Sequence, residues 1–428
     1  MERRYYEALG EEVLWEVLPN GLPLVIVPRP GFTKKLAYFV TDYGAIHRSF
    51  RLEGSQHTAP AGVAHFLEHK MFDMPGRDVS GEFAALGASV NAFTSFDMTA
   101  YYFGCTDRFY ESLDLLLDFV STGYFTEESV QKEQGIIGQE IGMYEDNPES
   151  KVFDLLMENM YRRHPVTTPI LGTVESIAQI TPQVLQQCHK AFYRPDNMLL
   201  CVVGDVDAQQ VRSVALNRVS APDGPKPEAV RTWQEDMTCT RSYAEAHMEV
   251  SMPMFQMGFK CEPLGRGEEA VRQELVGDLA AEALFGESSR LYLKLYEEGL
   301  IDSAFGGGFE TLEGMAMLTA FGDSDDPEAV YKAILEEAQN LARTGIGDAE
   351  FLRMKRSAMG RRIRGLDSFD STAFRVCAYH FSGFDYFRFP EIYETLDRQA
   401  VQDFLQQVAV PERASLACIY PISQEETI

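Results

Sequence analysis

The sequence predicts an α+β protein made of two similar halves, and three features of the chain lead to this expectation. Runs with β-strand character alternate with amphipathic stretches of helical periodicity. The order of these elements between residues 63 and 141 returns between about residues 271 and 363, which indicates an internal duplication. Residues 220–227 carry three prolines and one glycine in eight positions, which is typical of an interdomain linker.

The first half is expected to begin with a β-hairpin, because two β-rich runs flank Asn20-Gly21, the strongest short hairpin signal. A polar segment that ends at Pro60 then leads to a helix within residues 62–72. Further strands are expected at 36–40, 89–95, 99–103 and 198–203, and further helices at 80–86, 108–120, 126–144, 150–161, 173–179 and 182–192.

The second half is expected to repeat this order of elements without the residues that could bind a metal. Its first helix contains no histidine, and Lys355 and Arg362 stand where the first half carries Glu133 and Glu140. We therefore expect an N-terminal domain at 1–215, a linker at 216–240 and a C-terminal domain at 241–428. The second half should contain helices at 271–285, 289–298, 326–343 and 347–363, and strands at 301–309, 315–321 and 414–420.

The composition is that of an ordinary globular protein, with 45% hydrophobic and 24% charged residues in 428 positions. No apolar run follows the arginines near Met1, and no stretch reaches the length of a membrane span, so neither a signal peptide nor a membrane helix is expected. The seven cysteines are scattered and lack any Cys-x-x-Cys pair. This pattern indicates reduced thiols in a cytoplasmic protein and argues against a cysteine zinc site.

The formal charge of -27 argues against a nucleic-acid partner, because phosphate binding needs a basic surface. Two interpretations of this acidity stay open. Negative potential inside a cavity would favour basic substrates, whereas an evenly acidic surface would only keep the protein in solution.

The pattern His65-Phe66-Leu67-Glu68-His69 carries the main chemical signal of the chain. Residues four apart on an α-helix share one face, so both imidazoles would project together, with Glu68 beside them. Two neutral imidazoles suit Zn²⁺, and an adjacent carboxylate can take a proton from a metal-bound water. The order His-x-x-Glu-His is the inverted zinc-peptidase motif. The alternative is a pair of core histidines beside an incidental acid.

A third ligand is expected on the helix that follows Thr126. Glu133 and Glu140 are seven residues apart and therefore lie on one face of that helix. Ile136 and Ile137 are expected on the same face, and a carboxylate on an apolar face is costly to bury unless a cation or a donor meets it. This favours a role beside a metal over an exposed acidic helix.

Together these residues resemble the pitrilysin/insulinase family of zinc peptidases, the inverzincin class that includes the mitochondrial processing peptidase. The resemblance extends over nearly all 428 residues and is closest to a bacterial branch encoded beside a paralogous partner. Its landmarks are the His65–His69 motif, Gly87-Ala88-Ser89-Val90-Asn91-Ala92-Phe93-Thr94, the segment from Glu133 to Glu140, and Ser289-Arg290-Leu291-Tyr292.

The resemblance implies the LuxS/MPP-like metallopeptidase fold, with two homologous domains that each contain a mostly antiparallel sheet packed with helices. It implies that one zinc ion per chain is bound by His65, His69 and Glu140. Glu68 would be the general base, and Glu133 would orient the site from behind the ligands. Asn91 and Ala92 match the strand edge on which family members align an extended peptide.

One part of the family pattern is missing from the second half. Active single-chain members carry an Arg, and seven residues later a Tyr, that bind the substrate backbone. Here Tyr296 stands at the Arg position and Ser303 at the Tyr position, although an alignment slip near Gly299 is an alternative. We therefore expect a zinc-bearing subunit of a heterodimer, whose paralogous partner supplies the Arg and Tyr.

The resulting hypothesis is a zinc endopeptidase that cleaves peptides or unfolded segments. A non-catalytic structural subunit, and a peptide-binding module that keeps zinc only for stability, are the alternatives. A scaffold has no need of a general base, so the presence of Glu68 favours the enzyme.

Overall fold

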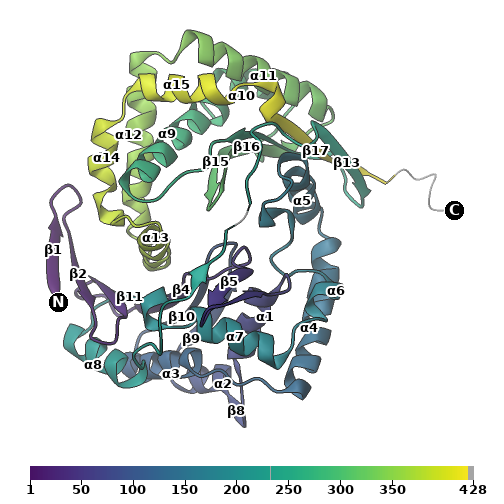
Figure 1. Ribbon diagram of the computed structural model, residues 1–428. Helices are drawn as coiled ribbons and strands as arrows, with labels where there is room; N and C mark the ends of the chain where they lie inside the picture. Colours follow the sequence, from purple (N-terminus) through teal and green to yellow (C-terminus); the bar gives the residue numbers. More distant parts are fainter. Residues whose placement is uncertain (232, 423–428) are drawn as a thin grey trace. The chain divides into compact units, whose positions relative to one another are not determined.

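The computed structural model describes residues 1–231 and 233–422, which divide into two compact units (Figure 1). Within these residues, the first unit comprises 1–141, 168–231 and 363–388. The second comprises 142–167, 233–362 and 389–422. No helix in the described part of the chain is long and apolar enough to cross a membrane.

A seven-stranded sheet forms the centre of the first unit, in the order β1-β2-β3-β11-β4-β10-β9. Strands β3 and β11 are parallel, and every other neighbouring pair in this sheet is antiparallel. The β2–β3 pair is the hairpin predicted from Asn20-Gly21. The strands span Glu2–Tyr6 (β1), Glu11–Val17 (β2), Pro23–Pro28 (β3), Lys35–Thr41 (β4), Ser89–Thr94 (β9), Thr99–Cys105 (β10) and Met198–Gly204 (β11).

One face of this sheet carries most of the helices of the first unit. Phe39, Phe103 and Leu200 point to this face and belong to a large buried apolar cluster. Because side chains alternate along a strand, Tyr38 and Tyr102 lie on the other face, where their rings stack at 4.5 Å. The helices are α1 (Val63–Met71), α2 (Val79–Ala85), α3 (Phe109–Ser121), α6 (Val174–Ile177), α7 (Pro182–Phe192) and α8 (Ala208–Arg218), with α4 (Glu127–Glu145) following α3.

The other face of the first sheet is covered by α13 (Phe369–Phe381), which comes from the second half of the sequence and packs on β4 and β11 (Figure 1). Phe374 of this helix lies against Phe93 of β9, with 5.9 Å between ring centroids. No helix was expected in this segment from the sequence.

The second unit contains a five-stranded sheet in the order β13-β17-β14-β16-β15. This order repeats β3-β11-β4-β10-β9, and β13 and β17 are again the parallel pair. The repeated topology confirms the internal duplication and the mostly antiparallel sheets. The strands span Tyr243–Met248 (β13), Met254–Cys261 (β14), Gly306–Leu312 (β15), Met315–Asp323 (β16) and Ala414–Pro421 (β17), so β15 begins five residues later than residue 301, where a strand was expected.

Helix α5 (Pro148–Met160) belongs to the second unit although it lies in the first half of the sequence. It packs on β13, β14 and β17, and Asn159 donates a hydrogen bond of 3.2 Å to the Leu416 carbonyl. One helix from each half of the sequence thus packs on the sheet formed by the other half. The compact units therefore differ from a division of the chain into 1–215 and 241–428.

The remaining elements of the second unit are α9 (Glu268–Phe285), α10 (Arg290–Glu297), α11 (Pro327–Thr344), α12 (Asp348–Gly365), α14 (Phe389–Thr395) and α15 (Arg398–Val408). Two small sheets complete the described chain: β5 (Ser49–Leu52), β6 (Ser55–Thr58) and β12 (Glu228–Ala229), and β7 (Asp73–Met74) with β8 (Arg77–Asp78). Short 3₁₀ turns span Pro165–Thr167, Pro195–Asn197, Tyr386–Arg388 and Pro411–Arg413.

Candidate metal centre

Helix α1 places the histidine motif between the apolar core and a polar site. Val63, Leu67 and Met71 are buried in the core cluster, as the helical spacing predicts. The helix begins after Gly62, whose φ of 85° and close approach to the Leu171 carbonyl leave no room for a side chain. The start of the helix, and with it the direction of the motif, is therefore set by a glycine.

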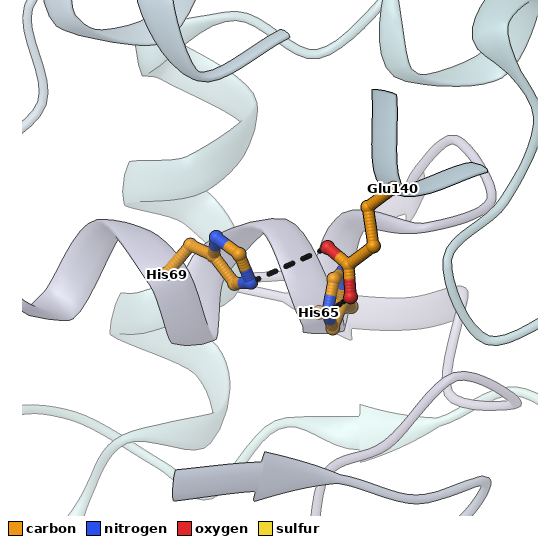
Figure 2. A group of neighbouring side chains, drawn as sticks. All are labelled: His65, His69 and Glu140. Carbon is orange, nitrogen blue, oxygen red and sulfur yellow. Dashed lines mark ion pairs between the residues drawn. The ribbon is translucent and has the colours of Figure 1, made fainter. Parts of the chain in front are cut away.

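Three ligand atoms converge from α1 and α4 (Figure 2). The Nε2 atom of His65 lies 3.6 Å from Oε1 of Glu140, and the Nε2 atom of His69 lies 3.7 Å from Oε2 of the same carboxylate. Ligands that surround a tetrahedral zinc ion at about 2.0–2.2 Å are separated by roughly 3.5 Å. The donor set and its spacing therefore fit Zn²⁺.

The pKa values of the two imidazoles are shifted in opposite directions. Burial, with a smaller effect of His69, lowers the pKa of His65 to about 3, so its ring is neutral near pH 7. A neutral ring presents a lone pair to a metal. The pKa of His69 is raised, first by the hydrogen bond to Glu133.

Glu133 stands behind His69, on the side away from Glu140. Its Oε1 atom lies 3.0 Å from Nδ1 of His69, and Glu133 is buried, whereas the His69 side chain is 28% exposed. A carboxylate at Nδ1 holds the proton there and leaves Nε2 to the metal. Glu133 thus contacts the ring nitrogen of His69 that faces away from Glu140.

Glu68 lies on the same side of α1 and is 9% exposed. Burial raises its pKa, and the nearby charge of Glu140 acts in the same direction. The Thr94 hydroxyl donates a hydrogen bond of 2.7 Å to Oε2 of Glu68, which opposes this rise. In the sequence Thr94 stands out only as the last residue of the segment that begins at Gly87, because no local spacing links it to Glu68.

Asn91 and Ala92 lie on β9, the edge strand of the first sheet, which contacts α1. Ala92 pairs with Tyr101 of β10 on one side. On the other side its backbone N–H is met by the Oδ1 atom of Asn91 at 2.9 Å. The strand therefore presents an outer edge within the same unit as the metal ligands.

One expectation about α4 is wrong. Ile137 is buried, but Ile136 is 45% exposed and does not share an apolar face with the glutamates. The side chain of Glu140 is itself 42% exposed, whereas Glu133 is buried. Seven residues span slightly less than two full turns, so the apolar face passes through Val130, Glu133, Ile137 and Ile141 and leaves Glu140 at its border.

The second unit holds a charge-inverted counterpart of this centre. Glu274 and Asp278 are four residues apart on α9, as His65 and His69 are on α1. Nη2 of Arg362, the residue matched to Glu140, lies 2.9 Å from Glu274 and 2.8 Å from Asp278. A guanidinium thus stands where the first unit has the Glu140 carboxylate, and it binds the two acids directly. The pattern Glu274-x-x-x-Asp278 beside Arg362 is visible in the sequence but was missed.

Tyr296 and Ser303 stand at the positions where the Arg and Tyr of the substrate clamp are expected to be missing. They lie on or just after α10. Tyr296 is exposed and stacks on Tyr292, with 5.9 Å between ring centroids and 9° between planes. Gly299, with φ of 71°, follows the helix, and Ser303 lies in an exposed turn beyond it.

The duplicated α+β fold carries, within the described residues, a group of two histidines and one glutamate that could hold a metal ion. Residues 53–174 match the family described as insulinase (peptidase family M16), and residues 179–358 match the peptidase M16 inactive domain. The chain belongs to peptidase family M16, which confirms the resemblance to the pitrilysin/insulinase family.

Relatives of similar length support this assignment. The chain is 38% identical over 425 residues to YmfH, an uncharacterized zinc protease of Bacillus subtilis (strain 168), with 98% of this chain and 99% of that protein covered. It is 30% identical to a second such zinc protease of that strain, YmxG, over 74% of this chain and 78% of the relative. A solved M16-like peptidase of Alicyclobacillus acidocaldarius superposes with a TM-score of 0.93 at 33% identity, covering 97% of this chain and 99% of that one.

Proposed function

We propose that the protein is a zinc-dependent endopeptidase that hydrolyses peptides or unfolded segments. The observation that carries this proposal is the convergence of His65, His69 and Glu140 beside the buried carboxylate of Glu68. The relatives named zinc proteases add support. The metal-bearing half is assigned to residues 1–215 of the sequence, and the half without a metal to residues 241–428.

The ligand set would hold one zinc ion, which would supply Lewis acidity to a bound water and to the scissile carbonyl. Glu68 is the base that accepts the proton of the attacking water at its carboxylate and delivers it to the departing amine. Its raised pKa brings the carboxyl group closer to neutral pH, where it can both accept and release a proton.

The outer edge of β9 supports an extended substrate. A peptide that adds to this edge as a further strand would be held by its backbone, independently of most of its side chains. Asn91 must release the N–H of Ala92 when such a strand binds, so its amide becomes free to contact the peptide. Folded substrates would not present an extended backbone to this edge.

We further propose that the chain is the zinc-bearing subunit of a heterodimer. Tyr296 and Ser303 stand where single-chain members carry the Arg and Tyr of the substrate clamp. A paralogous partner would supply both side chains. All seven cysteines are free and six of them are buried, which supports a location in the reducing cytoplasm.

The test measures bound zinc and hydrolysis of an unfolded fluorogenic peptide for the purified chain, alone and with a paralogue that carries the Arg and Tyr. We expect one zinc per chain, with full activity only in the presence of the paralogue. Glu68→Gln should keep the zinc and lose hydrolysis by about 100-fold or more, whereas Glu128→Gln, an exposed acid on α4, should change neither.

Two results would contradict the proposal. Zinc binding without hydrolysis in any combination would favour a structural or peptide-binding subunit. Full activity of the chain alone, unchanged by the paralogue, would keep the peptidase but remove the heterodimer.

A further inference from the structure

We propose that Thr94 is a positioning residue that holds the carboxylate of Glu68 towards the metal ligands; this inference rests on the proposed peptidase function. The Thr94 hydroxyl donates to Oε2 of Glu68 at 2.7 Å. A hydroxyl has one proton to donate, so Oε1 of Glu68 stays available to take a proton from water. The contact therefore distinguishes the two oxygens of the base.

Thr94 is itself held in place by the strand that carries it. It is the last residue of β9 in the ladder with β10, where it pairs with Thr99. The hairpin closes directly behind it, with a hydrogen bond of 2.8 Å from the Ser95 N–H to the Met98 carbonyl. Because threonine is β-branched, its χ1 angle is also restricted. The donor thus has little freedom to move.

The hydrogen bond from Thr94 matters because the nearby carboxylate of Glu140 repels the carboxylate of Glu68. The carboxylates of Glu68 and Glu140 lie beside the same histidines, and Glu68 is 9% exposed, so little water screens their charges from each other. Repulsion between two carboxylates would turn the flexible side chain of Glu68 away from the ligand set. The hydrogen bond from Thr94 opposes this repulsion and fixes a side chain with three rotatable bonds.

The same strand carries the edge expected to receive the peptide. Asn91 and Ala92 lie three and two positions before Thr94 on β9. The substrate edge and the support of the base are therefore parts of one rigid strand, and a peptide aligned on the edge is also aligned with Glu68. This predicts that loss of the Thr94 hydroxyl affects the chemical step more than peptide binding.

The test compares Thr94→Val, which keeps the branched shape and removes the hydroxyl, with Thr94→Ser, which keeps the hydroxyl. Both are assayed as zinc-loaded full chains together with any partner that activity requires. We expect Thr94→Val to lower kcat by about 10- to 100-fold, with KM and zinc content unchanged, and Thr94→Ser to stay within a few-fold of the unmodified protein. Thr311→Val on β15, the corresponding edge strand of the second unit, is the matched control.

Crystal structures of the variants give a result that does not depend on activity. The Glu68 carboxylate should leave its position in Thr94→Val and keep it in Thr94→Ser. A normal kcat in Thr94→Val, a loss that serine does not restore, or an unmoved carboxylate would overturn the inference. If the unmodified protein hydrolyses no peptide but the carboxylate moves as described, the peptidase proposal fails and the positioning role stands.

Discussion

The Nδ1 atom of His69 and Oε1 of Glu133 lie 3.0 Å apart, so the ring of His69 can turn only its Nε2 atom towards Glu140. This contact fixes a tautomer and a ring orientation before any metal binds. It also shows why two glutamates on one helix have different roles. Glu133 is buried behind the ligands, and Glu140 lies at the border of the apolar face, among them.

Removing the carboxylate of Glu133 should weaken zinc binding without removing a ligand. We expect Glu133→Ala to lower the zinc affinity by about 10- to 100-fold, as measured by competition with a chromophoric chelator. Glu133→Gln keeps an acceptor oxygen and should lose less. An unchanged affinity in Glu133→Ala would show that the packing of α1 alone orients His69.

Metal removal should lower both stability and activity in a reversible way. A ligand present at 100 times its dissociation constant stabilises a protein by about 2.7 kcal/mol. We therefore expect a chelator to lower the melting temperature and abolish hydrolysis, and added Zn²⁺ to restore both. His65→Ala should show no such shift, whereas Glu68→Gln should keep it, because Glu68 is not a ligand. A zinc-dependent shift of normal size in His65→Ala would contradict the assigned ligand set.

The charge-inverted centre of the second unit should contribute to stability only. The Arg362 side chain is 9% exposed and meets two acids, so Arg362→Ala leaves Glu274 and Asp278 facing each other. We expect a loss of about 2–4 kcal/mol in the free energy of unfolding, measured with denaturant. The neighbouring Arg361 pairs with Glu282 but is 53% exposed, so Arg361→Ala should cost less than about 1 kcal/mol. Equal losses in the two variants would show that burial of the pair is unimportant.

His164 should make the protein less stable in mild acid. It is fully buried, with Nε2 2.8 Å from the Glu313 carbonyl and Nδ1 accepting from the Val166 N–H, so the ring is held neutral. Burial lowers its pKa from 6.5 to about 4. The unfolded chain therefore binds the proton more readily, and stability that is present above pH 6.5 is lost as the pH falls towards 4.

The free energy of unfolding should fall by about 3 kcal/mol, because each unit by which the pKa of His164 is lowered corresponds to 1.36 kcal/mol. Unfolding of the metal-free protein at pH 7 and pH 4.5 measures it. The free energy of unfolding should differ less between pH 7 and pH 4.5 in His164→Gln than in the unmodified protein. Other buried histidines contribute equally to both proteins. The same pH dependence in both proteins would show that His164 is not responsible.

The residues proposed as ligands could be named from the sequence because the spacing within each pair depends on local geometry. His65 and His69 are one helical turn apart, and Glu133 and Glu140 are two turns apart, so regular helices bring each pair to one side. Thr94 could not be assigned in the same way. It lies 26 residues from Glu68, and only the pairing of β9 with β10 and the packing of β9 on α1 bring the two together.

In the fold, too, some elements could be predicted from local sequence patterns and others could not. Turn residues and periodicity were sufficient for the β2–β3 hairpin and for most elements of the two repeats. They were not sufficient for α13, β14 or the β5–β6 pair, which received no prediction. Short apolar runs such as residues 254–261 satisfy both helix and strand patterns, so their neighbours in the sheet decide their structure.

The sequence by itself determined the family and the duplication, and it named the residues that we propose as metal ligands, because these depend on residue type and on short spacings. Only the tertiary structure decided that α5 packs on the second sheet and α13 on the first. It also decided that Thr94 hydrogen-bonds to Glu68 and that Arg362 lies between two acids of α9. These contacts join segments that are far apart in the chain. Their free energy comes from burial and pairing between elements, and no local pattern of residues encodes which elements meet.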